Sequence, residues 1–234
     1  MIFYHTPVII ACAPGSVAET CGDPATVHSF FENMATVKPG ERKLQILQAL
    51  AVMLEQPKSE KITTAALAAR LAVSEAALYR HFASKAQMFE GLIEFIESSV
   101  FGLINQIAEQ QNDGLSQAQA ITTMLLNFAE RNPGMTRVMI GEALVNEDVR
   151  LQARMNQFIE RIELALKQSL RIAVTQGHAK EAEVAARANL IVNFIIGGWH
   201  RFAKTGFKQL PSGSLDGQIT LLLIDALVGF YPTN

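Results

Sequence analysis

From Glu41 onward the apolar residues recur at helical spacing, and this pattern limits the fold more than any other feature of the chain. Steps of three and four residues place side chains on one face of a helix. The first such stripe consists of Leu44, Leu47, Leu50, Ala51 and Leu54, and Pro57 follows its end. No alternation with a period of two lasts more than a few residues, so we expect no sheet. The pattern predicts an all-α protein.

Capping and turn residues divide the rest of this pattern into separate helices. Ser84 and Gln87 form a capping box that opens a long helix, which Asn112-Asp113-Gly114 ends. Asn146 is expected to cap a second long helix, which Gly177 stops. The remaining helices are expected at Ser116–Arg131, Met135–Leu144, Glu147 to about Gln176, Ala182–Lys204 and Leu215–Phe230.

The last two of these helices are apolar on almost every face. Residues 190–199 read LIVNFIIGGW, and residues 219–230 read ITLLLIDALVGF. A helix without a polar face is expected to be buried on all sides. One solution is a C2 dimer in which the same two helices of a second subunit cover them, with Gly197 and Gly198 allowing close backbone approach. The other solution is burial within one large core.

Residues 62–85, ITTAALAARLAVSEAALYRHFASK, contain two short helical patterns separated by a three-residue break. Thr63 or Thr64 can cap the first helix, because a threonine hydroxyl accepts from the N–H groups of an opening turn. Ser74 can cap the second, and Glu75 suits the positive end of its dipole. Two short helices joined by a tight turn are typical of a helix-turn-helix, whose second helix enters the major groove of DNA.

The second helix, expected to extend through Phe82, exposes groups suited to DNA. Leu78 and Phe82 lie four residues apart and should face inward. The outward set then consists of Tyr79, Arg80, His81 and, in the next turn, Lys85. These side chains can donate to phosphate oxygens, and an arginine can also bind a guanine edge. The alternative is a helical hairpin with a solvated polar face and no role in binding.

The charge of the chain favours a local DNA-binding surface. The formal net charge is −2 and the sequence pI is about 6.2, which excludes a basic coat over the whole molecule. Residues 34–90 carry eight bases and five acids, whereas residues 91–234 carry twelve bases and fourteen acids. Residues 1–33 carry three acids and no base. The only net-positive part therefore contains the helix-turn-helix pattern, as phosphate binding requires.

Several other classes of protein lack support. Cys12 and Cys21 form no C-x-x-C pair and have no histidine at ligand spacing, so neither a metal site nor a disulfide is expected. No apolar run is long enough for a membrane helix. The chain contains no nucleophile elbow, Gly-rich phosphate loop or H-E-x-x-H motif, so we expect no enzyme and no cofactor.

The N-terminal residues differ from the rest. Prolines and glycines punctuate residues 1–37, and no helical period survives there, so we expect a disordered extension. Met34 begins MATVKPGERK, which reads like a natural start, and residues 1–33 could then reflect the choice of an upstream start codon.

The recognition-helix sequence resembles that of the TetR family of bacterial repressors. Leu78, Tyr79, His81, Phe82 and Lys85 match the most specific stretch of that family. Further blocks are similar to its nucleoid-occlusion factors, namely ITTAALAA, VSEAALYRHF, GLIEFIES, ERNPG and the pattern RxNQxxERIExxL at Arg154–Leu166. This resemblance implies a helix-turn-helix domain at residues 38–84 and a helical dimerisation and partner-binding domain at residues 85–234.

The resemblance also implies a function. Such proteins are homodimers in the cytoplasm that bind palindromic sites across the nucleoid. When bound to DNA they engage FtsZ, the tubulin-like division GTPase, and antagonise its assembly into a ring. The implied DNA contacts are Thr63, Thr64, Ser74, Tyr79, His81 and Lys85, to which the residue pattern adds Glu75 and Arg80.

The implied surface for the division partner consists of Phe95, Arg131 and Asn132. Each has a structural alternative, because Phe95 can belong to the core and the other two can satisfy carbonyls at a helix end before Pro133. Leu103 stands where the pattern has an arginine, and Asn127 where it has a glycine.

An ordinary repressor released by a small apolar ligand is the competing interpretation. It requires a pocket in the C-terminal domain with a few polar groups among apolar walls. The candidate residues for such a pocket are Asn127, Asn193, Trp199 and His200. Residues of these types are more often satisfied buried polar groups or packed aromatic rings.

Overall fold

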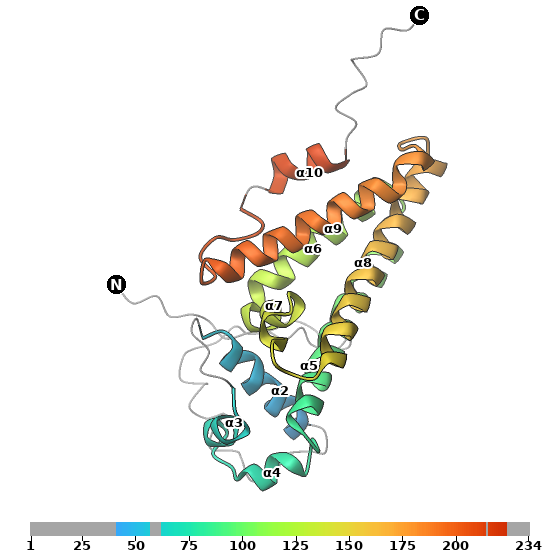
Figure 1. The fold of residues 1–234 in the computed structure, drawn as a ribbon. Helices are drawn as coiled ribbons and strands as arrows, with labels where there is room; N and C mark the ends of the chain where they lie inside the picture. Colours follow the sequence, from blue (N-terminus) through green and yellow to red (C-terminus); the bar gives the residue numbers. More distant parts are fainter. Residues whose placement is uncertain (1–40, 57–61, 214, 224–234) are drawn as a thin grey trace, which may run out of the picture.

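The computed structural model describes residues 41–56, 62–213 and 215–223, and every regular element in these ranges is helical (Figure 1). This confirms the all-α prediction. The expected extension at 1–37 and the end of the last helix beyond residue 223 lie outside the described residues. The elements are α2 (Glu41–Leu54), α3 (Thr64–Arg70), α4 (Glu75–Tyr79), α5 (Lys85–Gln110), α6 (Gly114–Arg131), α7 (Pro133–Met139), the 3-10 helix η1 (Glu142–Leu144), α8 (Val149–Thr175), α9 (Glu181–Lys204) and α10 (Leu215–Leu223).

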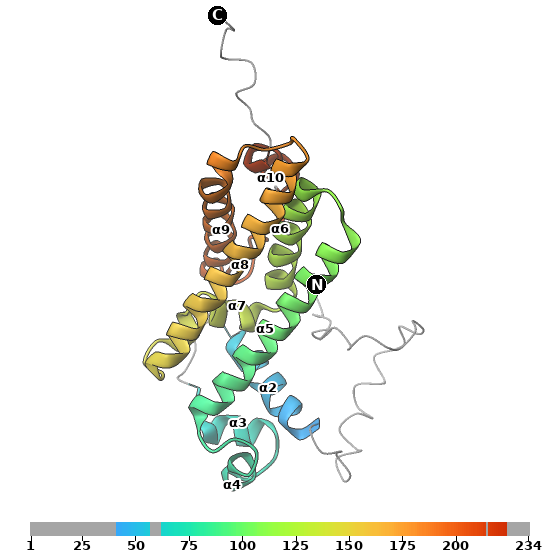
Figure 2. The ribbon, with the colours of Figure 1, turned by 90° about the vertical axis from the view of Figure 1, so that its right-hand side faces the viewer.

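Helix α5 connects the two ends of the molecule. Helices α2, α3 and α4 gather around its beginning, whereas α6, α8, α9 and α10 form a bundle toward its far end (Figures 1 and 2). With 26 residues, α5 is about 39 Å long. It begins at Lys85, next to the division predicted between residues 84 and 85, and it contacts α2 as well as α6 and α8.

One continuous apolar core extends through both parts. The inward face of α5 contributes Phe89, Ile93 and Val100, each at most 1% exposed. In the bundle, α8 packs between α6 and α9. Trp199 of α9 is fully buried there, and its indole N–H donates to the Leu125 carbonyl at 3.2 Å. The helices of this bundle therefore hold one another through side-chain packing, which is the main stabilising contribution in a helical domain.

A buried arginine joins the helix-turn-helix part to the bundle. Arg137 of α7 is 5% exposed, and its Nη1 donates to the Gln56 carbonyl just beyond α2, at 2.5 Å. Its guanidinium also stacks over the Phe207 ring, with 5.1 Å to the centroid. A second close approach lies beside it, because Gly134 packs directly against the backbone of Ala51. The end of α2 is therefore fixed to α7.

Between α6 and α8 two predicted helix boundaries were wrong. The expected helix Met135–Leu144 is broken, because Gly141 adopts φ +77°, a left-handed conformation that separates α7 from η1. The cap of α8 is Asp148, whose carboxylate accepts from the N–H of Arg150 at 3.0 Å, and not Asn146. Asn146 instead takes φ +66° in the preceding turn, where asparagine is tolerated better than most residues.

The predicted burial of α2 needs correction, and α9 and α10 keep exposed leucines in the single chain. In α2 the buried side chains are Ile46, Ala49, Leu50, Ala51 and Leu54, while Leu44 is 38% exposed. The helix is rotated because it packs on α3, α5 and α7 together. In α9 and α10, Leu190 is 55% exposed and Leu221 73%. A single chain thus buries only one face of these helices.

Within the described residues no helix is long and apolar enough to cross a membrane.

Candidate nucleic-acid interface

Helices α3 and α4 form the helix-turn-helix, and each begins with a hydroxyl cap. The Thr63 hydroxyl accepts from the N–H of Ala66 at 3.1 Å, so Thr63 rather than Thr64 caps α3. The Ser74 hydroxyl accepts from the N–H of Ala77 at 3.3 Å at the start of α4. Between the helices, Ala72 adopts φ +52° and closes the turn. The predicted motif is confirmed, with the caps that its sequence favours.

Helix α4 is shorter than predicted. It ends at Tyr79, with Arg80 as its C-cap, so His81 and Phe82 lie in the turn that leads to α5. Leu78 is fully buried and Phe82 is 8% exposed, as their spacing predicts. Arg80 is exposed and His81 is partly exposed, so these two predicted DNA-contacting side chains remain at the surface although they lie beyond the end of α4.

A small polar cluster connects the exposed sides of α3 and α4. Tyr79 is 45% exposed, and its hydroxyl donates to the Thr64 Oγ1 at 3.5 Å. The Thr64 hydroxyl in turn donates to the Glu75 carboxylate at 2.5 Å. Three of the predicted DNA contacts therefore lie together, and the cluster orients the Tyr79 ring at the surface.

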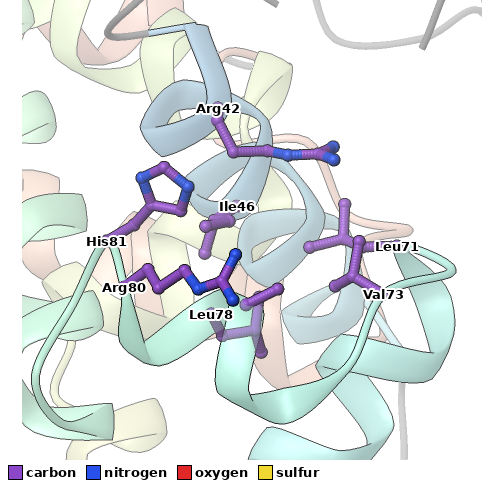
Figure 3. A pocket seen from close by; sticks show the side chains of 8 residues that line it. Arg42, Ile46, Leu71, Val73, Leu78, Arg80 and His81 are labelled. Carbon is purple, nitrogen blue, oxygen red and sulfur yellow. The ribbon is translucent and has the colours of Figure 1, made fainter. Parts of the chain in front are cut away.

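Arginines from two different helices meet at a pocket on this part of the molecule. Figure 3 shows Arg42 extending from α2 and Arg80 from the end of α4 toward a cavity of about 170 Å³, which His81 also lines. The floor of the pocket is apolar, with Ile46 and Leu78 among its residues. Arg42 is held in place because its Nη1 donates to Gln45 at 3.0 Å. This convergence of donors around an uncharged floor suits the oxygens of a phosphate.

Lys85, the remaining predicted cation, has a protein partner. Its Nζ forms an ion pair with Glu147, which lies in the turn before α8, and it also lies 5.6 Å from the centroid of the Phe89 ring. Sequence reasoning missed Glu147. The two residues are 62 positions apart, and no local pattern signals such a pair.

The three residues predicted for the division partner differ in exposure. Arg131 is exposed at the end of α6. Asn132 is only 8% exposed, and its Nδ2 donates to the Phe128 carbonyl at 2.8 Å, which is the helix-end role given as its alternative. Phe95 is half-buried on α5 and packs against the core. Helices α5 and α6 pack on each other, and Figure 2 shows the end of α6 beside the middle of α5.

The residues suggested for a ligand pocket do not converge. Trp199 is buried against α6, whereas Asn193 and His200 are exposed on the same helix. The amide of Asn193 donates to Asn189 one turn earlier, at 2.9 to 3.0 Å. His200 lines an open groove between α7, α8 and α9 that includes none of the other three candidates.

Comparison with family models and solved structures identifies the class of protein to which this chain belongs. Residues 46–92 match the family model of bacterial regulatory proteins, tetR family, and residues 112–226 match the SlmA-like C-terminal domain of tetracyclin repressor-like proteins. Among solved structures, a TetR transcription regulator from Haloarcula marismortui aligns with a TM-score of 0.66 at 14% identity, covering 78% of this chain and 96% of that one. The regulator FadR from Bacillus halodurans aligns with 0.67 at 15%, covering 80% and 97%. Fold and helix-turn-helix together define a DNA-binding regulator of the TetR type.

Closer relatives specify the family. Nucleoid occlusion factor SlmA from Alteromonas mediterranea is 47% identical over 186 residues, which are 79% of this chain and 95% of that protein. The proteins of the same name from Idiomarina loihiensis and Vibrio cholerae are 49% and 46% identical, covering 76% and 81% of this chain and 91% and 97% of their own lengths. The chain therefore belongs to the SlmA family of nucleoid occlusion factors.

Proposed function

We propose that this protein binds palindromic sites on the chromosome as a homodimer and, when bound, engages FtsZ and antagonises assembly of the division ring over the nucleoid. The observation that carries the proposal is the identity of about 47% to a relative named nucleoid occlusion factor, over 79% of this chain. The match includes both the helix-turn-helix and the bundle. It therefore also includes the helices on which the surface for FtsZ is predicted.

The geometry supports the DNA-binding half of this proposal. The donors of Tyr79, Arg80 and His81 lie at one end of the molecule, beside the pocket reached by Arg42. In a C2 dimer the two helix-turn-helix ends would bind two half-sites separated by one turn of DNA. The operator would then fix the distance between the two ends. Because α5 extends from the DNA-binding end into the bundle, a fixed distance would favour one arrangement of the bundles, and this is how DNA could promote partner binding.

Genome-wide occupancy of the tagged protein in its host tests the proposal. We expect tens of palindromic sites scattered over the chromosome and sparse near the terminus. A duplex with the recovered site should then increase binding of the purified protein to FtsZ, whereas a scrambled duplex of equal length should not. One or two peaks beside its own gene and a metabolic operon would contradict the proposal and indicate a local repressor.

The ligand-released repressor needs polar groups that converge in one pocket. Buried Trp199 donates to the Leu125 carbonyl of α6, whereas exposed Asn193 donates to the Asn189 carbonyl of its own helix. This separation favours the nucleoid-occlusion proposal over the repressor.

A further inference from the structure

The ion pair between Lys85 and Glu147 lies where the DNA-binding end meets the bundle. Lys85 is the first residue of α5, directly after the helix-turn-helix, and Glu147 lies in the turn between η1 and α8. The side chains are only 23% and 15% exposed, so solvent screens the pair weakly. Glu147 is therefore an acid from the bundle that neutralises a cation of the proposed DNA surface.

The contact between α5 and α8 does not depend on this pair alone. Further along the same two helices, Arg154 donates to both oxygens of the Glu97 carboxylate, at 3.2 and 2.7 Å. Arg161 of α8 also stacks over the Phe101 ring, with 3.8 Å to its centroid. These contacts lie away from the helix-turn-helix, and they hold the helices together when the end of α5 loses its ion pair.

We propose that Glu147 sets the DNA affinity of this protein by competing with a backbone phosphate for the ammonium group of Lys85. The inference rests on the proposed DNA-binding function, to which Lys85 contributes a phosphate contact. To contact phosphate, the ammonium group must leave Glu147 or share its charge with it. The carboxylate thus lowers the affinity for every DNA sequence, because phosphates carry no base information.

The exchange has a measurable signature in salt dependence. A cation that contacts phosphate releases counterions, which contributes about 0.9 to the slope of log K against log salt. When Lys85 leaves Glu147, the exposed carboxylate takes up a cation and cancels much of that release. Glu147→Gln removes this uptake because the amide is neutral. The variant should therefore bind DNA more tightly and with a steeper salt dependence.

The test is fluorescence anisotropy of the full chain with a palindromic and an unrelated duplex over a range of salt concentrations. For Glu147→Gln we expect affinity several-fold higher at low salt for both duplexes, and a slope steeper by about one. In a Lys85→Gln background the same substitution should leave DNA affinity unchanged. Glu97→Gln is the matched control, because it removes an ion pair between α5 and α8 that lies away from the helix-turn-helix, and it should not tighten DNA binding.

Three results would overturn the inference. They are no tightening in Glu147→Gln, equal tightening in Glu97→Gln, or tightening that persists without Lys85. If Glu147→Gln does not fold, Glu147→Asp withdraws the carboxylate by one methylene and should tighten binding to a smaller degree; unchanged affinity would again overturn the inference. If the wild-type chain binds neither duplex, the proposed DNA-binding function is wrong. If the wild-type chain binds tightly and Glu147→Gln does not change its affinity, only the inference about Glu147 is wrong.

Discussion

Tyr79 tests DNA binding at the scale of a single residue. Its side chain is exposed at the end of α4, and its hydroxyl donates a long hydrogen bond to Thr64, at 3.5 Å. We expect Tyr79→Phe to weaken binding to all duplexes alike, by about 1 kcal/mol, because one phosphate contact is lost. Affinity measurements on the recovered site and on a scrambled duplex check this. A loss confined to the recovered site would show instead that Tyr79 contacts a base.

Arg131 tests the partner surface at the same scale. It is exposed on the last turn of α6, and none of the described residues bonds its guanidinium. Arg131→Asp should abolish binding of FtsZ to the DNA-bound protein, since charge reversal adds repulsion to the lost contact. DNA affinity and the unfolding temperature should stay unchanged. Arg171→Asp, at an exposed site on α8, is the control and should leave FtsZ binding unchanged. If only Arg131→Asp lowers the unfolding temperature, Arg131 has a structural role.

The contact between α2 and α7 is a property of whole elements. A Cβ on Gly134 would lie 1.9 Å from the Ala51 carbonyl oxygen and 2.9 Å from its carbon, so the two helices would have to separate. Gly134→Ala should therefore lower the free energy of unfolding by about 2 kcal/mol. Gly102→Ala, at an exposed position of α5 where a Cβ meets nothing within 4 Å, should instead add up to about 1 kcal/mol through helix propensity. Denaturant unfolding measures the free energy of unfolding of both variants. Equal changes in the two variants would contradict the close approach of α2 and α7.

The cap of α8 predicts a pH dependence. Hydrogen bonds from Arg150 lower the pKa of Asp148 from 3.8 to about 2. Because the pKa is lower in the folded chain, the carboxylate stabilises it fully above pH 3.8 and this contribution disappears as the pH falls toward 2. Asp148→Asn keeps a capping oxygen but cannot ionise, so its unfolding temperature should fall below wild type near pH 6 and approach it only near pH 2. A difference that is constant with pH would contradict the assignment.

Dimer formation is the prediction that belongs to the whole molecule. The exposed leucines of α9 and α10, Leu190 and Leu221, extend the apolar surface that a second copy would cover. Leu190→Arg should raise the dimer dissociation constant at least about tenfold, or about 1.4 kcal/mol, because it buries an unpaired charge. Sedimentation at several concentrations measures this. Leu164→Arg, on α8 with 51% exposure, is the matched control, and dissociation of that variant alone would place the interface along α8.

Local features were predictable from the sequence because neighbouring residues encode them. The hydroxyls of Thr63, Ser74 and Ser84 cap their helices, and the inward positions of Leu78 and Phe82 follow from their spacing. These are interactions of three or four residues, which the order of side chains along a helix fixes directly. The helical class and the position of the helix-turn-helix follow from the same short-range pattern.

The tertiary structure decided the features that depend on packing between distant segments. It rotated α2 so that Ile46 rather than Leu44 is buried, and it placed Arg137 on the Gln56 carbonyl, 81 positions away. It also brought Glu147 to Lys85, across the boundary between the DNA-binding end and the bundle. Helical periodicity shows that a face is apolar but not which partner covers it, because that choice depends on how all the helices fill the core together.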